Sequence, residues 1–232
     1  MNFPTNAFLQ IRKNQIQANI GSRKNISPSL IVPVILITAG TTIVLTNDKT
    51  QLDEQIREAI RGNGRLSVDD YLIYVPLVTD IGLSLGGVRS RHNITDKALI
   101  YVLATSINAL LVYPAKYLIG RERPDKSNLV SFPSGHSSNA FVGATYFWNE
   151  YQDIHPVLAG TGFANALVTG LFRIYNDKHW ASDVICGAGI GILSAHLADW
   201  LYPSLKKIVP KSDKIVLKPI ASSNEFGIAI DF

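Results

Sequence analysis

The sequence predicts an all-helical membrane bundle of six spans. Of its 232 residues, 47% are hydrophobic and only 17% are charged, which excludes a disordered chain and allows one sizeable core. Uncharged or nearly uncharged stretches recur at residues 30–45, 71–88, 98–115, 137–149, 156–172 and 184–205. A spanning helix needs about 20 mainly apolar residues, so together these stretches favour a bilayer. The modest mean hydropathy of +0.14 leaves a soluble all-helical enzyme as the alternative.

A basic segment precedes the first apolar stretch. Residues 1–27 contain four basic residues and no acidic residue. The basic residues are Arg12, Lys13, Arg23 and Lys24. A cleaved secretory peptide reaches its apolar core sooner and ends in a small-x-small site, so we interpret this region as an uncleaved signal anchor. Residues 48–62 then place apolar side chains at helical period between charges, which predicts a short surface helix.

Small residues mark the last two apolar stretches. They are Gly160, Gly162, Gly170, Gly187, Gly189 and Gly191. Small residues let helices approach closely in a membrane, so we expect packing contacts at these positions. The last three also form a Gly-x-Gly-x-Gly pattern, but a dinucleotide fingerprint needs a strand before it and a helix after it. Because the pattern lies inside an apolar run, we reject nucleotide binding.

The C-terminal tail differs from the rest of the chain. It is basic, and alternating apolar residues on both sides of residues 221–225 predict two short strands. A lone hairpin is only marginally stable in water, so we expect it to lean on another surface. The chain is thus divided into a basic N-terminal segment (1–27), a six-helix membrane domain (28–203) and a basic tail with a hairpin (204–232).

Charge gives the orientation. A net charge of +4 suits nucleic acid, an anionic membrane surface or a phosphorylated ligand, and the apolar pattern selects the membrane rather than nucleic acid. Six spans place both termini on one face, which then carries twelve of the 22 Lys and Arg residues. The positive-inside rule therefore places the termini in the cytoplasm. The single cysteine, Cys186, excludes an intrachain disulfide and a cysteine-based zinc site.

Three polar segments lie on the opposite, outer face. In the first, Lys116 and Arg123 are seven residues apart, close to two helical turns, and are expected to project from one side of a helix that Pro124 helps to end. Two cations converge there. Ordinary snorkelling at a helix end is the alternative for this segment taken alone.

The second segment is a Pro-Ser-Gly-His turn. Pro133 fixes the entry of the chain, Gly135 permits close backbone approach, and Ser134 or Ser137 caps a helix that begins near His136. The start of a helix, with unpaired N–H groups and a positive dipole, binds anions readily, and a histidine in that turn can donate a proton. A plain cap with a structural histidine is the alternative.

The third segment runs from Arg173 to Asp183. His179 and Asp183 are four residues apart, so on a helix the carboxylate could hold one imidazole nitrogen and leave the other free. An oriented neutral histidine is a competent nucleophile, and the fork of Arg173 suits phosphate oxygens. A surface His–Asp pair, with Trp180 anchored at the membrane interface, is the alternative.

The order and spacing of these segments resemble the type 2 phosphatidic acid phosphatase (PAP2) superfamily. The patterns are Lys-x6-Arg-Pro, Pro-Ser-Gly-His and Arg-x5-His-x3-Asp, each at the end of an apolar run. The resemblance covers residues 116–183 by motif and about 28–203 by helix layout. The family commonly has Ser before the Arg of the third motif, where this chain has Phe172. That difference is expected to weaken one phosphate contact or to alter substrate choice.

The resemblance implies a role for each matching residue. His179 attacks phosphorus while Asp183 orients it, and His136 protonates the leaving oxygen before activating water. Five further groups surround the phosphoryl oxygens. These are the side chains of Lys116, Arg123 and Arg173 and the backbone of Ser134 and Gly135. The cations supply the charge that magnesium supplies elsewhere, so no metal and no other cofactor is expected.

The sequence therefore predicts a metal-independent phosphatase of a lipid phosphate, monoester or diphosphate, acting through a phosphohistidine. We expect it in the cell membrane, a bacterial inner membrane, with its site on the non-cytoplasmic face. Candidate substrates are phosphatidic acid, phosphatidylglycerol phosphate, undecaprenyl diphosphate and the phosphates of lipid A, and the residues do not rank them. The sequence does not address the oligomeric state.

Two other classes use the same anion site. Vanadium haloperoxidases are larger and soluble, and the apolar stretches argue against them. A non-catalytic lipid-phosphate binder would be expected to lose His179 or Asp183, and both are present. Outside the motifs, three polar residues lie in apolar stretches, where hydrogen bonding between helices is favoured over a polar path. They are Asp80, His196 and Asp199.

Overall fold

The core of the protein is a helical bundle. The computed structural model describes residues 28–46, 51–64, 66–208, 216–222 and 225–231, so the predicted basic segment 1–27 lies outside the described residues. A 3-10 turn (Pro28–Leu30) precedes the first of eight α-helices in these ranges. The helices are α2 (Ile31–Leu45), α3 (Leu52–Ile60), α4 (Asp69–Leu72), α5 (Val75–Leu85), α6 (Ile94–Ile119), α7 (Gly135–Tyr151), α8 (Pro156–Tyr175) and α9 (Ala181–Ile208).

Each predicted apolar stretch coincides with a helix, except that the second is divided into α4 and α5. Pro76 stands in the first turn of α5, where its missing N–H costs no helical hydrogen bond. The surface helix predicted within residues 48–62 is confirmed as α3. By length and composition, α6, α8 and residues 181–207 of α9 are able to cross a membrane, and α2 and α5 are shorter apolar helices. Six crossings remain a prediction.

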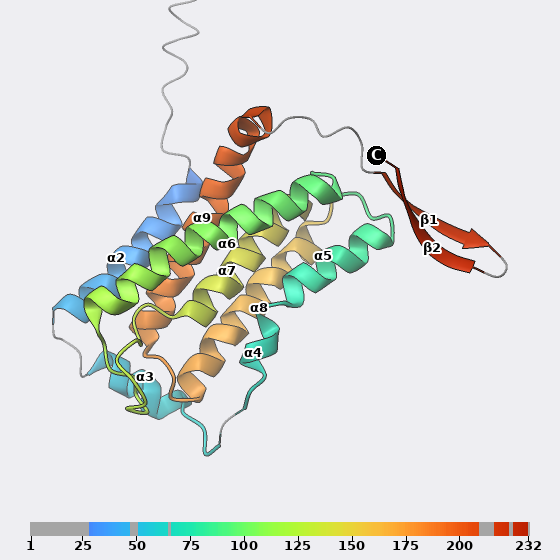
Figure 1. Cartoon of the computed structure of the whole chain (residues 1–232). Coiled ribbons are helices and arrows are strands. Elements are labelled where there is room, and N and C mark those ends of the chain that lie inside the picture. Colours follow the sequence, from blue (N-terminus) through green and yellow to red (C-terminus); the bar gives the residue numbers. More distant parts are fainter. Residues whose placement is uncertain (1–27, 47–50, 65, 209–215, 223–224, 232) are drawn as a thin grey trace, which may run out of the picture.

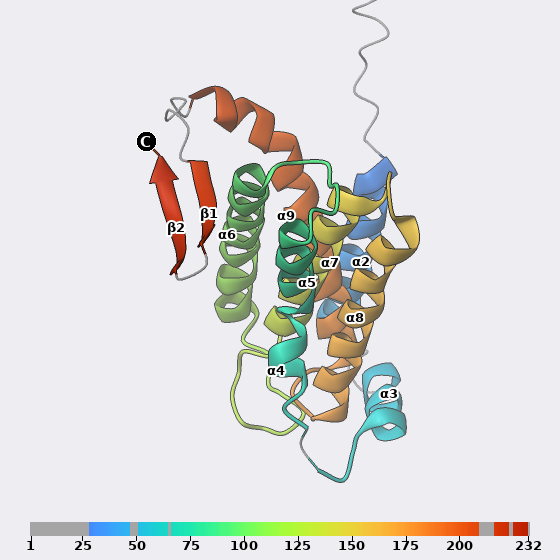
Figure 2. The same cartoon turned by 90° about the vertical axis from the view of Figure 1, so that its right-hand side faces the viewer.

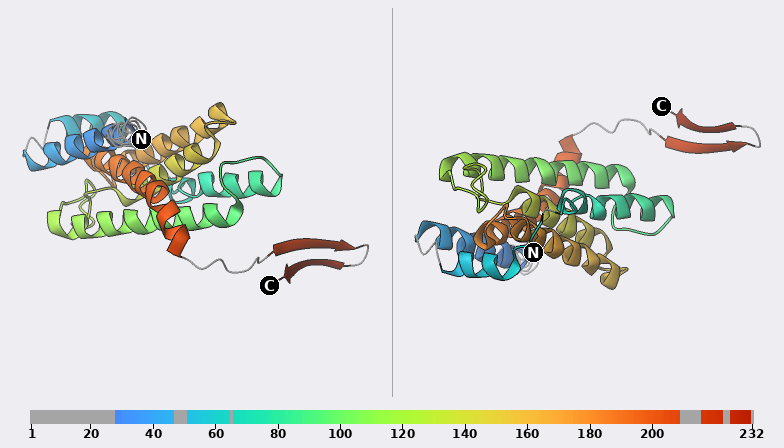
Figure 3. Two further views of the ribbon diagram at one scale, coloured as in Figure 1. Left: turned by 90° about the horizontal axis from the view of Figure 1, so that it is seen from above. Right: turned by 90° about the horizontal axis from the view of Figure 1, so that it is seen from below.

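The helices α7 and α9 form the centre of the bundle (Figure 1). Helix α9 packs against α2, α6 and α7, while α7 also packs against α8. Views along the bundle show α7 and α9 between α6 on one side and α2 and α8 on the other (Figure 3). The starts of α7 and α9 therefore lie at the same end of the molecule as the ends of α6 and α8 (Figure 2).

Glycines on α9 let it lie directly on α7. A Cβ atom added to Gly187 would stand 2.5 Å from the Ser134 carbonyl oxygen, and one added to Gly191 would stand 2.2 Å from that of Ser138. Close helix approach was predicted at these positions and is confirmed. The same prediction is wrong for Gly160, where an added Cβ would meet nothing within 4 Å. The contact at Gly187 matters for the site because it fixes the first turn of α7 against α9.

A buried polar network joins α5, α6 and α7. Asp80, 4% exposed, accepts a hydrogen bond from Lys97 Nζ at 2.7 Å and from the Tyr151 hydroxyl at 2.8 Å through Oδ1. Its Oδ2 accepts from the Tyr146 hydroxyl at 2.8 Å. Since buried charges are tolerated when they are paired and hydrogen-bonded, Asp80 has a structural role, with Lys97 as its partner.

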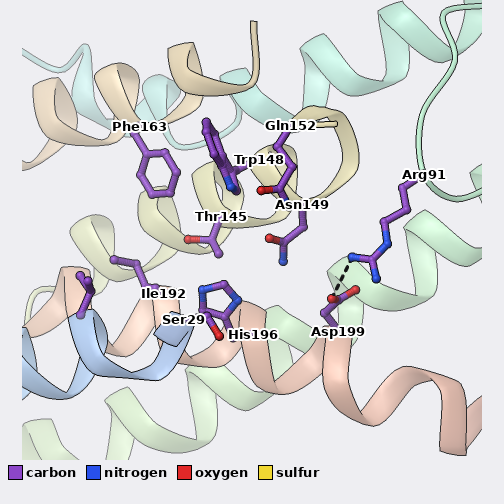
Figure 4. Close-up of a pocket in the computed structure, with 11 residues that line it drawn as sticks. Ser29, Arg91, Thr145, Trp148, Asn149, Gln152, Phe163, Ile192, His196 and Asp199 are labelled. Carbon is purple, nitrogen blue, oxygen red and sulfur yellow. Dashed lines mark hydrogen bonds and ion pairs between the residues drawn. The ribbon is translucent and has the colours of Figure 1, made fainter. Parts of the chain in front are cut away.

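A pocket of about 440 Å³, lined by both polar and apolar side chains, is shown in Figure 4. It lies near the end of α7, at the end of the bundle opposite the three motifs. His196 and Asp199 of α9 line it, together with Asn149 and Trp148 of α7. Asp199 Oδ2 accepts a hydrogen bond from Arg91 NH1 at 3.1 Å, which ties α9 to the connection between α5 and α6. Hydrogen bonding between helices was predicted for His196 and Asp199, but Asp199 instead pairs with a residue of a connecting segment, and both residues line this pocket.

The tail contains β1 (Val216–Ser222) and β2 (Glu225–Asp231). The two strands pair antiparallel, with Val216 opposite Asp231 at one end and Ser222 opposite Glu225 at the other. Their backbones thus satisfy each other's hydrogen bonds, as a sheet requires.

Candidate active site

Backbone and side-chain contacts tie the three motif segments together at one end of the bundle. The Ser134 N–H donates to the Asp183 carbonyl at 3.0 Å, which joins the start of α7 to the start of α9. Lys116, in the last turn of α6, donates through Nζ to the carbonyls of Val130 at 2.8 Å and Pro133 at 2.7 Å. Residues that are far apart in the sequence are therefore brought to one place.

The predicted helical face shared by Lys116 and Arg123 is wrong. Helix α6 ends at Ile119, and Gly120 follows with φ of 58°, the left-handed conformation that closes many helices. Arg123 therefore lies in the loop after the helix. Its Nε is buried and has no hydrogen-bond partner among the described residues. Burial, with the nearby charge of Arg173, lowers the pKa of Arg123.

The Pro-Ser-Gly-His turn forms the start of α7. Ser134 is the N-cap, and its Oγ accepts a hydrogen bond from the Ser137 N–H at 3.3 Å, so Ser134 is the capping residue of the two predicted. The N–H groups of Gly135 and His136 stand in the first turn, where a helix offers them no acceptor. An N–H pair at a positive helix end is a suitable site for an oxyanion.

His179 lies beside Asp183 in the protein interior. The side chains are 1% and 0% exposed, and His179 Nδ1 is 3.7 Å from Asp183 Oδ2, longer than a hydrogen bond. Asp183 Oδ2 instead accepts from the Ser131 hydroxyl at 2.5 Å and from the Trp180 N–H at 3.0 Å. Because α9 begins at Ala181, His179 precedes the helix rather than sharing its face. The two residues are in contact, and a small movement would bring Nδ1 into hydrogen-bond range.

The imidazole of His179 is kept neutral. Burial lowers its pKa to about 4, although Asp183 acts in the opposite direction. Between pH 6.5 and 4 the unfolded chain thus binds a proton that the folded chain does not. The free energy of unfolding should fall as pH falls through this window, by about 3 kcal/mol in total.

We expect this loss to disappear in His179→Gln, which has no group titrating there. Thermal unfolding of both proteins in detergent, from pH 7 to pH 4.5, measures the effect. The midpoint temperature of the wild type should decline more steeply than that of the variant. Parallel curves would contradict the assignment of a neutral buried imidazole.

Two carboxylates complete the site. Arg173 NH1 forms a buried ion pair with Asp69 Oδ2, while Arg173 Nε is buried without a partner among the described residues. The Nε2 of His136 lies 3.0 Å from Asp70 Oδ1. Asp69 and Asp70 of α4 therefore orient one predicted phosphate ligand and the predicted acid. Across the described ranges, no group of three or more His, Cys, Asp or Glu side chains could hold a metal ion.

The model of the PAP2 superfamily matches residues 97–207, which contain all eight predicted site residues. This part of the chain is a PAP2-type region. Two solved structures share its fold at 22% identity. Aquifex aeolicus LpxE has a TM-score of 0.52, and the match covers 65% of this chain and 96% of that one. The transmembrane PAP2 type phosphatidylglycerolphosphate phosphatase of Bacillus subtilis has a TM-score of 0.51, and the match covers 78% of this chain and 98% of that one. With its long apolar helices, this chain is a membrane protein.

Two curated proteins are similar in sequence. A lipid A 1-phosphatase of Porphyromonas gingivalis is 36% identical over 154 residues, which are 65% of this chain and 35% of that protein. The chain thus spans about a third of the length of that relative. Phosphatidylglycerophosphatase B of Bacillus subtilis is 28% identical over 171 residues, which are 67% of this chain and 80% of that protein.

The acids that support the PAP2 site were missed in the sequence. Asp69 and Asp70 stand outside the three motifs and outside the matched residues 97–207. One signal was available: both acids directly precede an apolar stretch, on the face where the topology of six spans also places the motifs. Their partners, more than 60 residues away, are visible only in the folded chain.

Proposed function

We propose that this protein is a lipid phosphatase that forms a phosphohistidine at His179. One observation carries the proposal: Arg123 Nε and Arg173 Nε are buried donors without a partner in the described part of the chain, close to a buried neutral histidine. Unpaired buried donors are costly unless a ligand satisfies them. A phosphoryl group has the charge and the oxygens to do so. Lipid phosphate is the substrate class because the similar curated proteins are named for two such phosphatases.

Binding comes first. The Arg123 and Arg173 guanidinium groups and the first-turn N–H groups of α7 would donate to the non-bridging oxygens, and Lys116 would add a third positive charge. Donors held in place before the reaction cost little reorganisation in the transition state, where negative charge spreads over these oxygens. The three cations provide the charge that a metal ion would otherwise provide.

In the first chemical step, His179 Nε2 attacks phosphorus as the bond to the leaving oxygen breaks. His136 gives its proton to that oxygen, so the lipid leaves as an alcohol, or as a phosphate from a diphosphate. Bond formation makes the His179 ring cationic, and Asp183 compensates that charge through Nδ1. Asp70 holds the His136 ring in place during the transfer.

In the second step, the neutral His136 takes a proton from a water molecule as that water attacks phosphorus. The P–N bond breaks, the electron pair returns to His179 Nε2, and inorganic phosphate leaves. Both imidazoles are then in their starting states, His136 protonated and His179 neutral.

The same proposal includes the location. Residues 28–203 form a six-span membrane domain with the termini in the cytoplasm of a bacterium, which puts the site at the outer face of the inner membrane. The basic residues of the terminal face support this orientation. A site at helix ends within the bilayer boundary suits a phosphate head group on a lipid tail.

We expect the detergent-solubilised protein to release phosphate from a lipid phosphate in excess EDTA as fast as without it. The measurement is inorganic phosphate release from phosphatidic acid, phosphatidylglycerol phosphate, undecaprenyl diphosphate and lipid A, each with and without chelator. The release rates rank the substrates. Loss of activity in EDTA, with recovery on adding a divalent metal, would contradict the metal-independent mechanism.

A further inference from the structure

Arg121 lies two residues before Arg123, but its hydrogen-bond partners are outside the predicted phosphate-binding residues. Its NH1 donates to Asp183 Oδ1 at 2.6 Å and to the Ser182 hydroxyl at 2.7 Å. In the non-helical segment after Gly120, side chains two residues apart need not share a direction. The Nε of Arg123 has no partner among the described residues. Arg121 instead forms an ion pair with Asp183, the carboxylate beside His179.

A second acid holds Arg121. Its NH2 donates to Asp53 Oδ2 at 2.8 Å, and Asp53 is 1% exposed. Asp53 also accepts from the Ser182 N–H at 2.9 Å through Oδ1 and from the Ser182 hydroxyl at 2.6 Å through Oδ2. The four side chains therefore follow one another from the nucleophile outward: His179, Asp183, Arg121 and Asp53. The outermost member stands on α3.

Helix α3 and the residues just after it also contact the end of α8 and the loop that carries His179. Figure 2 shows α3 beside this end of α8. Arg57 Nε donates to Asp177 Oδ1 at 2.7 Å, and Gly62 N–H donates to the Tyr175 carbonyl at 3.0 Å. Both arginines lie near the Trp180 ring, with Arg121 Cζ 5.4 Å and Arg57 Cζ 5.8 Å from its centroid. These contacts fix α3 against the site but do not reach Asp183.

We propose that Arg121 and Asp53 are positioning residues for the histidine nucleophile. Arg121 holds Asp183 through Oδ1, so that Oδ2 stays directed at His179 Nδ1, and Asp53 holds Arg121. The inference rests on the proposed function and extends it to α3, which none of the three motifs includes.

The physical reason is the charge that develops on His179. As the P–N bond forms, the ring becomes a cation inside the protein, where an uncompensated charge is costly. A fixed, ionised Asp183 compensates it, but a buried carboxylate itself requires a cation. Arg121 supplies that cation. Asp53 adds a second negative charge, so that the charges of the four side chains sum to zero when the His179 ring is cationic. Removing either outer member should slow the chemical step and leave phosphate binding intact, because Lys116, Arg123 and Arg173 are untouched.

The test compares Asp53→Asn and Arg121→Lys, which keep the size or the charge of the original group and so preserve the fold. We expect each to lower kcat by about 10- to 100-fold, the range for partners that orient a reactive group, with KM within about threefold of wild type. The rate of phosphohistidine formation in a rapid-quench experiment should fall by the same factor. Because Asp53 acts through Arg121, the double variant should lose little more than Arg121→Lys alone.

Arg57→Gln is the matched control. Arg57 stands on α3, as Asp53 does, and lies near Trp180, as Arg121 does. It pairs with Asp177 in the loop that carries His179 but does not contact Asp183. Its kcat should stay within about threefold of wild type. A loss in Arg57→Gln equal to that in Asp53→Asn would show that α3 is only a scaffold. Unchanged kcat in both test variants would also overturn the proposal.

A failure of the proposed function can be told apart from a failure of the positioning proposal. If His179→Ala releases phosphate as fast as the wild type, the phosphohistidine is wrong whatever the outer variants do. Binding of vanadate, a phosphate analogue that accepts an imidazole nitrogen, then tests the positioning by itself when it is measured by isothermal titration calorimetry. Asp53→Asn should bind vanadate about tenfold more weakly than Arg57→Gln. Equal affinities would reject the positioning role.

Discussion

His179→Ala is expected to release phosphate from a lipid phosphate at least about a thousandfold more slowly than the wild type. In the proposed mechanism the imidazole supplies the nitrogen of the P–N bond, and none of the groups beside it can replace it. Asp183 is turned toward Ser131, Trp180 and Arg121, with no oxygen free to attack phosphorus in its place. Phosphate release under initial-rate conditions measures the effect, and acid-quenched wild type should carry an acid-labile phosphoryl group that the variant lacks.

His155→Ala is the control for this experiment. His155 is exposed at the start of α8, at the opposite end of the bundle. The His155→Ala protein should therefore release phosphate at the rate of the wild type. If the His179→Ala protein folds and retains a tenth of the wild-type rate, His179 is not the nucleophile and the proposed mechanism is wrong.

Arg123→Gln should lower kcat/KM by about a hundredfold, the usual effect of removing one donor from an anion-stabilising site. Arg123 suits this test because, in the described part of the chain, it forms no ion pair with a buried acid, so its loss leaves no carboxylate there unpaired. The partner of Arg173, by contrast, is the buried Asp69. Both kcat and KM should change, since in the proposed mechanism the guanidinium contacts the phosphoryl group before and during transfer.

Lys126→Gln provides the comparison for Arg123. It removes a positive charge from the same loop, but Lys126 is exposed and is not part of the site. Kinetics of the two variants at low and moderate salt separate a specific contact from a general attraction for anions, because long-range attraction weakens as salt rises. An equal loss in both variants would mean that Arg123 acts only through net charge.

Much of the site could be predicted because its residues lie in short patterns at the ends of apolar stretches. Ser134 caps α7 through a local contact with Ser137, three residues away, and such contacts leave a readable sequence signature. The end of α6 was misplaced because Pro124 was taken as the terminator, whereas Gly120 adopts the left-handed conformation four residues earlier.

The partners of the supporting acids were beyond prediction for a different reason. Asp53 meets Arg121 across 68 residues, and Asp69 meets Arg173 across 104. Pairs of this kind depend on which helices become neighbours, and no local pattern encodes that. Asp80 is similar: its partner Lys97 stands on the next long helix, and the pair becomes visible only when α5 and α6 pack against α7.

The placement of these acids has a consequence for protein engineering. Residues 97–207 look like a self-sufficient cassette, since they carry every motif. A chimaera that grafted this cassette onto the first helices of a distant relative would nevertheless separate Arg121 and Arg173 from Asp53 and Asp69. Such a hybrid should insert and bind phosphate but turn over slowly, and restoring residues 51–70 along with the cassette should recover its turnover.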